Sequence, residues 1–432
     1  MLKEIKKIIF NLDRFLFKKF GTDKTLKFLE NTKEAQIIFS CLNEIGHESV
    51  VRFVGGCVRK SLSGEIIDDI DLATSLIPEE TKKKLEVKNI KVIDTGITHG
   101  TVTAIINNKK FEITSLRKDL STDGRHANVS FTKDWKDDAL RRDFTINAIY
   151  ADIEGRIYDP VNGILDLKSG KIKFIGSSEK RIQEDFLRIL RYFRFFLHYS
   201  KMEHDQEVIR SIKKNINGIS KISNERIFDE LNKILKLKNL YNLFSNEHSK
   251  EIFKNIFPQI KYYERLKILE KLNKKIRKKY DNTLLLAISI IDESNDYEYF
   301  CHKYKTSNKI KERFKNISKN YEEIKNKKFF KKENINKLRY VSKKNYVIDL
   351  VLFSICIDKK IEISEAIELI EYVSNFKTPK FPISGDYLKG YGYTPGPILG
   401  EKLKFLEEKW IENNFAINQK IIEKFLGKPK KN

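Results

Sequence analysis

The chain has 432 residues, more than the ~250–300 at which one hydrophobic core stops growing, so we expect two or more structural units. A hydrophobic content of 40% with 11% aromatic residues excludes a wholly disordered chain, and no uncharged apolar run of roughly 18 residues is present to span a membrane. The net charge of +24 favours a polyanionic partner, and a nucleic acid is the first candidate. Lys, Asn and Ile are over-used everywhere, however, so a biased genome would also produce this charge.

Residues 1–48 form a predicted helical extension. The first twenty are basic and amphipathic, and charged residues interrupt the apolar stretch that a secretory signal needs. We expect a helix packed on the body of the protein; a membrane-surface helix and an organellar presequence are the alternatives, and Glu4 and Asp13 fit a presequence poorly. Four isolated cysteines without zinc-type spacing predict free thiols in a reducing, cytoplasmic compartment: Cys41, Cys57, Cys301 and Cys356.

From about residue 50 to 176, short β-branched runs alternate with turn signals. This pattern predicts an α/β or α+β unit with one mixed or antiparallel sheet. Asn107-Asn108 should close a hairpin between TVTAII and KKFEITSL. The other expected strands lie in VRFVGG, DIDLAT, KVIDTG and the stretch from RIYDP to GKIKFIG, with further turns at Asp123-Gly124 and Asn162-Gly163.

The rest of the chain has helical periodicity. Between about 179 and 375 apolar residues recur at helical spacing and Pro258 is the one proline, which predicts an all-helical array. After Pro379 and Pro382 comes a Gly/Pro-rich connector, GDYLKGYGYTPGPILG, and then a last helix that Pro397 is suited to start. The expected fold class is therefore α+β, with a mixed-sheet head followed by helices.

The residues suited to chemistry gather in the head. Gly55-Gly56, after an apolar strand, would let backbone N–H groups approach phosphates, although such a pair is more often only a turn. Asp69 and Asp71 alternate with Ile70 and Leu72, so on a strand both carboxylates would share one face and suit a Mg²⁺ ion. Glu112 lies in an apolar strand and is the best candidate for a third acid, an outward-facing strand charge being the alternative.

Seven ordered motifs give the chain a family resemblance. Over residues 50–200 it resembles the bacterial class II tRNA nucleotidyltransferases, the CCA-adding enzymes, which are close relatives of bacterial poly(A) polymerase. The motifs are GGCVRK…DDIDLAT, DTGITHGTVTAII, FEITSLR, DGRH, LRRDFTINAIY, DPVNGILDL and RIQEDFLRILRYFRF, and GYTPGPILGEKL resembles the family's tail. The resemblance implies a polymerase-beta-like nucleotidyltransferase head followed by a helical neck, body and tail.

The resemblance also implies roles for the head residues. Asp69 and Asp71 would bind the catalytic Mg²⁺, while Gly55, Gly56 and Arg59 would handle the triphosphate. Lys60 stands where the family usually has an acid, so it is free to approach a phosphate or the primer. The RRDFTINA segment would hold the ribose and phosphates, since carboxylates accept from ribose hydroxyls and arginines face phosphates; its working residues would be Arg141, Arg142, Asp143 and Asn147.

Two further segments carry implied roles. EDFLR is expected on a helix, where Asp185 and Arg188 lie one turn apart and Arg191 continues the row; an ordinary Glu184–Arg188 ion pair is the alternative. In the family the acid and arginine read the Watson–Crick edge of the incoming base, accepting C and A and refusing U and G. RKDLSTDGRHANVSF resembles the flexible loop for switching from C to A addition, with a solvated connector as the alternative; its members would be Arg117, Asp123, Gly124 and Arg125.

The sequence therefore predicts addition of CCA to tRNA from CTP and ATP with Mg²⁺, without a membrane and with no protein partner inferred. Poly(A) addition is the second hypothesis, followed by a catalytically silent RNA-binding relative and a small-molecule nucleotidyltransferase. The expected domains are an extension over 1–48, a catalytic head over 49–178, a neck with the selecting helix over 179–240, a body over 241–375 and a tRNA-binding tail over 376–432.

Overall fold

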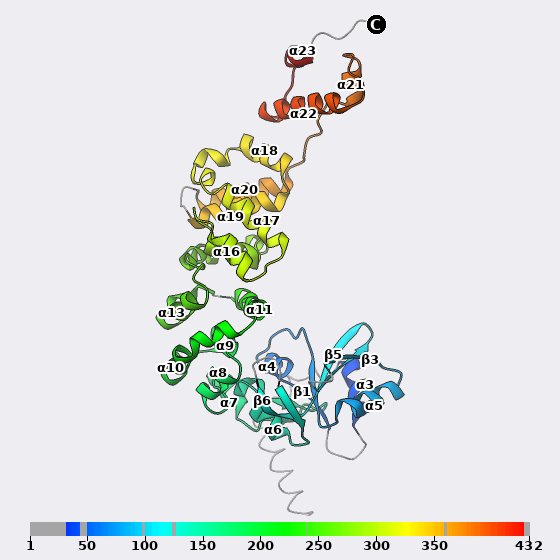
Figure 1. Ribbon diagram of the computed structural model, residues 1–432, viewed down its shortest axis with the longest axis vertical. Helices are drawn as coiled ribbons and strands as arrows, with labels where there is room; N and C mark the ends of the chain where they lie inside the picture. Colours follow the sequence, from blue (N-terminus) through cyan, green and yellow to red (C-terminus); the bar gives the residue numbers. More distant parts are fainter. Residues whose placement is uncertain are drawn as a thin grey trace, which may run out of the picture. The chain divides into compact units, whose positions relative to one another are not determined.

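The computed structural model describes most of the chain, in two compact units. The described residues are 32–43, 50–96, 100–122, 127–238, 240–357 and 361–426. The first unit comprises residues 1–238 and the second residues 239–432 (Figure 1). The helix predicted within residues 1–31 lies outside the described residues.

A seven-stranded mixed sheet forms the centre of the first unit, as the sequence predicts. Its strand order is β3-β4-β5-β2-β1-β8-β9, and every neighbouring pair is antiparallel except β2 and β5, which are parallel. The strands are β1 (Val51–Val54), β2 (Asp71–Thr74), β3 (Lys91–Gly96), β4 (Thr101–Ile106), β5 (Lys109–Ser115), β8 (Tyr150–Ala151) and β9 (Ile157–Tyr158).

The predicted hairpin at Asn107-Asn108 is confirmed. These residues have φ values of 50° and 62°, which asparagine tolerates and which match a two-residue turn between twisted strands. The hairpin fixes the register of β5, in which Phe111 and Ile113 are buried and Glu112 is exposed. Glu112 therefore points away from the core that Phe111 and Ile113 help to form.

Three helices and a second, small sheet complete the head. The helices α3 (Lys33–Leu42), α4 (Gly56–Leu62) and α5 (Pro78–Val87) contribute Ile38, Cys57 and Leu85 to the core on the face of Phe111. Strands β6 (Arg117–Thr122) and β7 (Ala127–Phe131) pair as an antiparallel ribbon.

The first unit ends in helices: α6 (Trp135–Arg141), α7 (Gly163–Ser169), α8 (Ser178–Glu184), α9 (Arg188–Tyr199), α10 (Gln206–Asn215) and α11 (Asn224–Leu235), with 3₁₀ turns η3 (Thr145–Asn147) and η4 (Ile216–Lys221).

The stretch from 159 to 175 differs from its prediction. GKIKFIG forms no strand; within it, one isolated bridge joins Phe174 to Phe144. Helix α7 forms instead because Asp159 accepts backbone N–H bonds at its start, 2.8 Å from Gly163 N. It packs on η3, where the Thr145 hydroxyl donates to Asp166 at 2.7 Å.

The second unit is helical, as predicted. Helix α19 (Lys344–Ile357) is apolar on nearly all sides and is its buried centre, where Asp349 is paired with Arg313 of α17 (Asn308–Lys319) at 2.7 Å. The other helices are α12 (Leu240–Ser245), α13 (Glu247–Ile256), α14 (Lys274–Arg277), α15 (Asn282–Ile290), α16 (Asp296–Lys303), α18 (Lys332–Val341), α20 (Ile363–Asn375), α21 (Gly385–Lys389), α22 (Pro397–Glu412) and α23 (Gln419–Leu426), with 3₁₀ segments η5 (Tyr263–Lys271), η6 (Glu323–Lys325) and η7 (Lys327–Phe330).

The C-terminal part of this unit departs from the prediction in two ways. Pro397 does start α22, but α22 is not the last helix, because α23 follows and contributes Ile422 and Leu426 to a small core with Leu406. The predicted connector also contains α21, which begins at Gly385. The preceding residue, Ser384, caps this helix, because its hydroxyl oxygen accepts a hydrogen bond from the Tyr387 backbone N–H.

The predictions of free thiols and of no membrane-spanning run can be compared with the structure. All four cysteines are free thiols, and Cys57, Cys301 and Cys356 are buried. Within the ranges that the structure covers, no helix combines the length and apolar character needed to cross a bilayer.

The contact between α7 and η3 predicts a strong glycine requirement at position 163. A Cβ added to Gly163 would lie 2.1 Å from the Thr145 carbonyl oxygen, so Gly163→Ala must displace η3 or α7. We expect a loss of about 3 kcal/mol or more in the free energy of unfolding, measured by urea denaturation. Gly96→Ala is the control, because a Cβ there would make ordinary contacts of 3.8 Å with Thr101. Equal stability of the two variants would contradict the prediction.

Candidate active site

The three predicted acids lie at the start of strand β2. Asp71 opens β2 and is the direct partner of Glu112 in the parallel β2–β5 register, so their Cα atoms stand side by side. Asp69 differs from its prediction: it is exposed and lies in the loop before β2, not on the strand with Asp71. Its charge still reaches Asp71, so the three carboxylates share one electrostatic environment.

Negative charge accumulates at Asp71. Burial and then the charge of Glu112 raise the pKa of the Asp71 carboxyl, and Asp69 adds to this, while Arg142 and Arg59 act in the opposite direction. In the described part of the chain, no three His, Cys, Asp or Glu side chains stand close enough to form a complete metal cage. An incomplete set of oxygen donors with excess negative charge fits a cation such as Mg²⁺, which takes its other ligands from water and phosphate.

The predicted glycine pair lies against these acids. Gly55 has φ = 66° and precedes α4, and a Cβ on Gly56 would be 4.0 Å from the Asp71 carboxylate. Only a residue without a side chain adopts the Gly55 conformation readily, so the backbone can turn sharply beside Asp71. The glycines thus hold the first turn of α4 close to the acidic group.

Arg59 is buried at the centre of the first unit. It is 6% exposed, and its guanidinium donates to the Asn147 side-chain oxygen. The guanidinium also lies over the rings of Phe195 and Tyr199 of α9, 4.8 and 5.2 Å from their centroids. Arg59 therefore joins α4 to η3 and to α9.

Lys60 has a local partner. Its ammonium lies 2.7 Å from the carboxylate of Asp68, an exposed acid that directly precedes Asp69. The approach of Lys60 to a phosphate or primer stays a prediction, and Asp68 balances the charge of the Lys60 ammonium.

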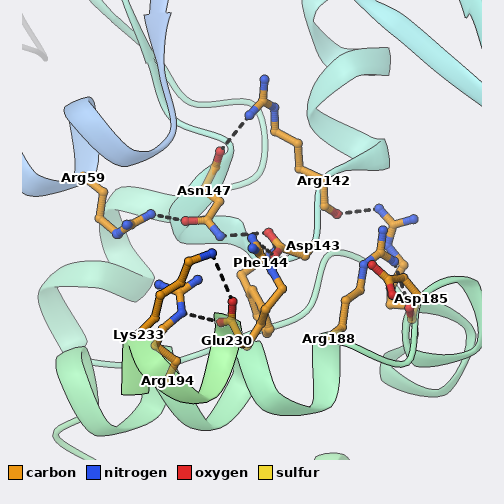
Figure 2. A network of polar contacts seen from close by, with 12 residues as sticks. Arg59, Arg142, Asp143, Phe144, Asn147, Asp185, Arg188, Arg194, Glu230 and Lys233 are labelled. Atoms are coloured by element: carbon orange, nitrogen blue, oxygen red, sulfur yellow. Dashed lines mark hydrogen bonds and ion pairs between the residues drawn. The ribbon is translucent and has the colours of Figure 1, made fainter. Parts of the chain in front are cut away.

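Asp143 and Asn147 connect the head to helix α9 (Figure 2). The Asn147 amide donates to Asp143 Oδ1 at 2.8 Å, and the Arg191 guanidinium donates to Asp143 Oδ2 at 2.7 Å. Burial alone would raise the pKa of Asp143, but Arg191, Asn147 and Arg188 together hold that pKa well below its usual range. Arg191 therefore bonds to the RRD segment and does not simply continue a row with Asp185 and Arg188.

The paired arginines depend on an acid that the motif analysis missed. Asp138 is 1% exposed and accepts from Arg141 at 2.8 Å, from Arg142 at 3.1 Å and from the Tyr150 hydroxyl at 2.7 Å. Burial alone would raise the pKa of Asp138, but the charges of Arg142 and Arg141 and the Tyr150 hydrogen bond lower it to about 2. The helical spacing in KDDALRR was the available signal, since Asp138 lies three and four residues before the arginines.

The expected selecting residues are not on one continuous helix. Helix α8 ends at Glu184, and α9 begins at Arg188; Asp185 has φ = −153° and ψ = 105°, outside the helical region. The Arg188 backbone N–H donates to the Asp185 carbonyl at 3.0 Å, so a turn brings the two residues together. The alternative Glu184–Arg188 ion pair is present, and the Arg226 guanidinium holds Asp185 at 2.8 Å.

The predicted flexible loop is mostly a hairpin. Arg117 is the first residue of β6 and not part of an irregular loop, while its role in the change from C to A addition stays a prediction. Asp123, Gly124 and Arg125 lie outside the described residues. Among the described residues, Arg117 pairs with Phe131 and Lys118 with Ser130, and the polar sequence of this segment gave no sign of this pairing.

His204, Cys301 and His302 are of residue types that can bind metal ions, but their surroundings are structural. His204 is buried, lies 3.0 Å from the Tyr192 hydroxyl and stacks on Phe196. Cys301 and His302 line a cavity of about 330 Å³ between α16 and α17 without forming a metal-ligand cluster.

Family comparisons agree with this fold. Residues 51–173 match the family described as the poly A polymerase head domain, and residues 201–264 match its probable RNA and SrmB-binding site. The mixed sheet joined to helices and the match to a polymerase head domain are those of the nucleotidyltransferase class, to which the relatives described next also belong.

Relatives that match this chain over more than nine tenths of their length narrow the class of protein to one family. The chain is 32% identical over 410 residues to mitochondrial CCA tRNA nucleotidyltransferase 1 of Mus musculus. The aligned residues cover 93% of this chain and 91% of the relative. It is 30% identical to the CCA-adding enzyme of Lactococcus lactis, over 92% of this chain and 96% of the relative. The chain belongs to the CCA-adding enzyme family.

Solved structures share the fold. The CCA-adding enzyme of Bacillus stearothermophilus in complex with CTP superposes with a TM-score of 0.68 at 24% identity, covering 91% of this chain and 96% of that one. The Thermotoga maritima CCA-adding enzyme complexed with tRNA gives 0.65 at 20% identity, covering 94% and 98%. The family and fold expected from the sequence are thereby confirmed.

The Asp138 cluster predicts a large cost for neutralising its acid. Asp138→Asn would leave Arg141 and Arg142 buried without their anion, so we expect a loss of about 3–5 kcal/mol in the free energy of unfolding. Asp137→Asn is the matched control, because Asp137 pairs with the half-exposed Lys118. In the wild type, the stability due to Asp138 should be lost as the pH falls from about 4 toward 2. Equal urea midpoints for the two variants would rule this out.

The raised pKa of Asp71 predicts that its ionised carboxylate destabilises the folded protein, the opposite of the effect of Asp138. The folded state disfavours the ionised form of the Asp71 carboxyl. The resulting loss of stability is absent below pH ~4, where this carboxyl is protonated in both the folded and the unfolded state, and it appears as the pH rises through the folded-state pKa. In metal-free buffer at pH 8, we expect Asp71→Asn to raise the free energy of unfolding by about 0.5–2 kcal/mol. Added Mg²⁺ should raise the melting temperature of the wild type but not of Asp71→Asn. A wild type that is indifferent to Mg²⁺ would contradict a metal site there.

Proposed function

We propose that this protein adds C, C and A to the 3′ ends of tRNA, using CTP and ATP and releasing pyrophosphate. The observation that carries this proposal is the alignment of Asp71 with Glu112 beside Asp69, in a chain whose full-length relatives are named CCA-adding enzymes. Relatives of the same fold are described in complexes with CTP, with ATP and with tRNA.

Enzymes of the nucleotidyltransferase class generally use a divalent metal ion, and we propose Mg²⁺ for this chain. Asp69 and Asp71 would hold it, with Glu112 beside them. When bound, the ion would neutralise triphosphate charge and acidify the primer 3′-hydroxyl. The donor set fits, because its carboxylate oxygens carry uncompensated negative charge and leave positions for water and phosphate oxygens.

The basic residues would orient the nucleotide. Arg59 and Arg142 lie close enough to Asp71 to affect its pKa, so guanidinium groups border the acidic group on the side of the glycine turn. We assign them, with Gly55 and Gly56, to the triphosphate. Asp143 and Asn147 would contact the ribose; their mutual hydrogen bond and the Arg191 ion pair keep both in fixed rotamers.

Asp185 and Arg188 would select the base. A carboxylate accepts from the exocyclic amino group of cytosine or adenine, and a guanidinium donates to the adjacent ring acceptor. Arg188 lies near enough to Asp143 to lower its pKa, which puts the selecting pair beside the proposed ribose site. Uracil and guanine present a carbonyl where the amino group is required, so they would leave buried groups unpaired.

We also carry forward the domain assignments as proposals. The head would span 49–178, the neck 179–240, the body 241–375 and the tRNA-binding tail 376–432, and the β6–β7 ribbon around Arg117 would serve the change from C to A addition. The free thiols favour a cytoplasmic location, while some relatives are mitochondrial. Cell fractionation would decide between the two compartments.

Incubation with a tRNA that lacks its 3′ CCA tests the function. With CTP alone the product should gain two C residues and stop, and with CTP and ATP it should end in CCA, as read by sequencing. Addition of A residues from ATP without prior C addition would instead favour poly(A) polymerase.

Alanine variants of neighbouring aspartates test the proposed metal site. Asp71→Ala should lower the rate of incorporation by about 10³-fold, equivalent to about 4 kcal/mol, while tRNA binding in a filter assay is unchanged. Asp69→Ala should behave in the same way. Asp68→Ala is the control, because Asp68 faces Lys60 rather than Asp71. Full activity in Asp71→Ala would overturn the assignment.

A further inference from the structure

Helix α11 holds a residue that acts on the proposed selecting pair. The Arg226 guanidinium donates to Asp185 Oδ2 at 2.8 Å, and Asp185 Oδ1 accepts from the Leu187 backbone N–H at 3.1 Å. Both carboxylate oxygens are therefore engaged, each with one partner. A carboxylate has about four lone-pair positions, so this arrangement fixes its orientation and leaves positions for a further donor.

Arg188 has different partners. Its guanidinium donates to the Glu184 carboxylate and, at 2.8 Å, to the Arg181 carbonyl. The opposite charges of Asp185 and Arg188 attract each other. Here, in the described part of the chain, no ion pair joins Asp185 to Arg188, because each is bound by a third residue.

The position of Arg226 is fixed by the packing of α11. One turn further along this helix, Glu230 is 1% exposed and binds the Arg194 guanidinium of α9, with Lys233 at 3.5 Å (Figure 2). Arg194 in turn lies over the Phe195 ring, 4.2 Å from its centroid. This buried anchor sets the register of α11 against α9, so the guanidinium of Arg226 is presented at a defined place.

We propose that Arg226 is a positioning residue for base selection, which keeps the Asp185 carboxylate oriented toward the incoming base and prevents it from closing onto Arg188. This inference rests on the proposed function of Asp185 and Arg188. Without Arg226, Asp185 keeps only the Leu187 N–H bond and can rotate to pair with Arg188. When Asp185 and Arg188 are paired with each other, they offer neither the acceptor nor the donor that cytosine and adenine require, so discrimination against uracil is lost.

The test is the incorporation of each nucleotide by Arg226→Gln. We expect the ratio of kcat/KM for CTP to that for UTP to fall by about 10–100-fold, mainly through a higher KM for CTP. Arg226→Lys should restore most of the ratio, because it returns a cationic donor. Arg210→Gln is the control: Arg210 is exposed on α10 and bonds only to its own helix at Gln206. An unchanged CTP-to-UTP ratio in Arg226→Gln would overturn the proposal.

A double-mutant cycle separates positioning from a general structural effect. If Arg226 acts through Asp185, Arg226→Gln should change selectivity no further in an Asp185→Asn background, whereas independent effects would add. Should Arg226→Gln fail to fold, Arg226→Met keeps the apolar stem and carries the same expectation. Failure of the wild type to add CCA would refute the proposed function; a wild type that adds CCA beside an Arg226 variant of unchanged selectivity would refute only this inference.

Discussion

The buried carboxylate of Asp143 is the contact on which the rest of the first unit depends. It accepts from Asn147 of η3 on one side and from Arg191 of α9 on the other, so it ties the sheet-bearing part of the unit to the first helices after it. A buried charge is tolerated only when its partners satisfy it. The lowered pKa of Asp143 shows that this condition is met, because its partners more than offset the cost of burial.

The same rule organises the surrounding charges. Asp138 neutralises Arg141 and Arg142, Glu230 neutralises Arg194, and each of these acids is 1% exposed. At Asp71, by contrast, burial and the charges of Glu112 and Asp69 outweigh the cations near it. An acid whose negative charge is reinforced by two neighbouring acids is suited to an external cation.

Local signals in the sequence were sufficient for the fold class. The Asn107-Asn108 turn and the alternation around Glu112 are properties of neighbouring residues, and they predicted the hairpin correctly. The spacing of Asp69 and Asp71 predicted that both lie on one strand, which is wrong because Asp69 lies in the loop before β2. The break between α8 and α9 was missed because apolar spacing continues through it, while the backbone turns at Asp185.

Contacts between distant segments could not be predicted. Arg226 meets Asp185 across 41 residues, and Arg59 meets Asn147 across 88, so neither pair has a periodicity to reveal it. Asp138 was within reach of helical spacing, but an acid beside two arginines has many ordinary explanations. The roles of these residues depend on the packing of α4, α9 and α11, which no short motif encodes.

The unequal settings of the two aspartates have a mechanical consequence. Asp71 belongs to a strand held on both edges, whereas Asp69 is carried by the exposed segment before it. Such a pair is stiff on one side and compliant on the other. If the two acids hold the ion as proposed, the loop that carries Asp69 would adjust when a highly charged product leaves, while the sheet would keep Asp71 in place for the next round.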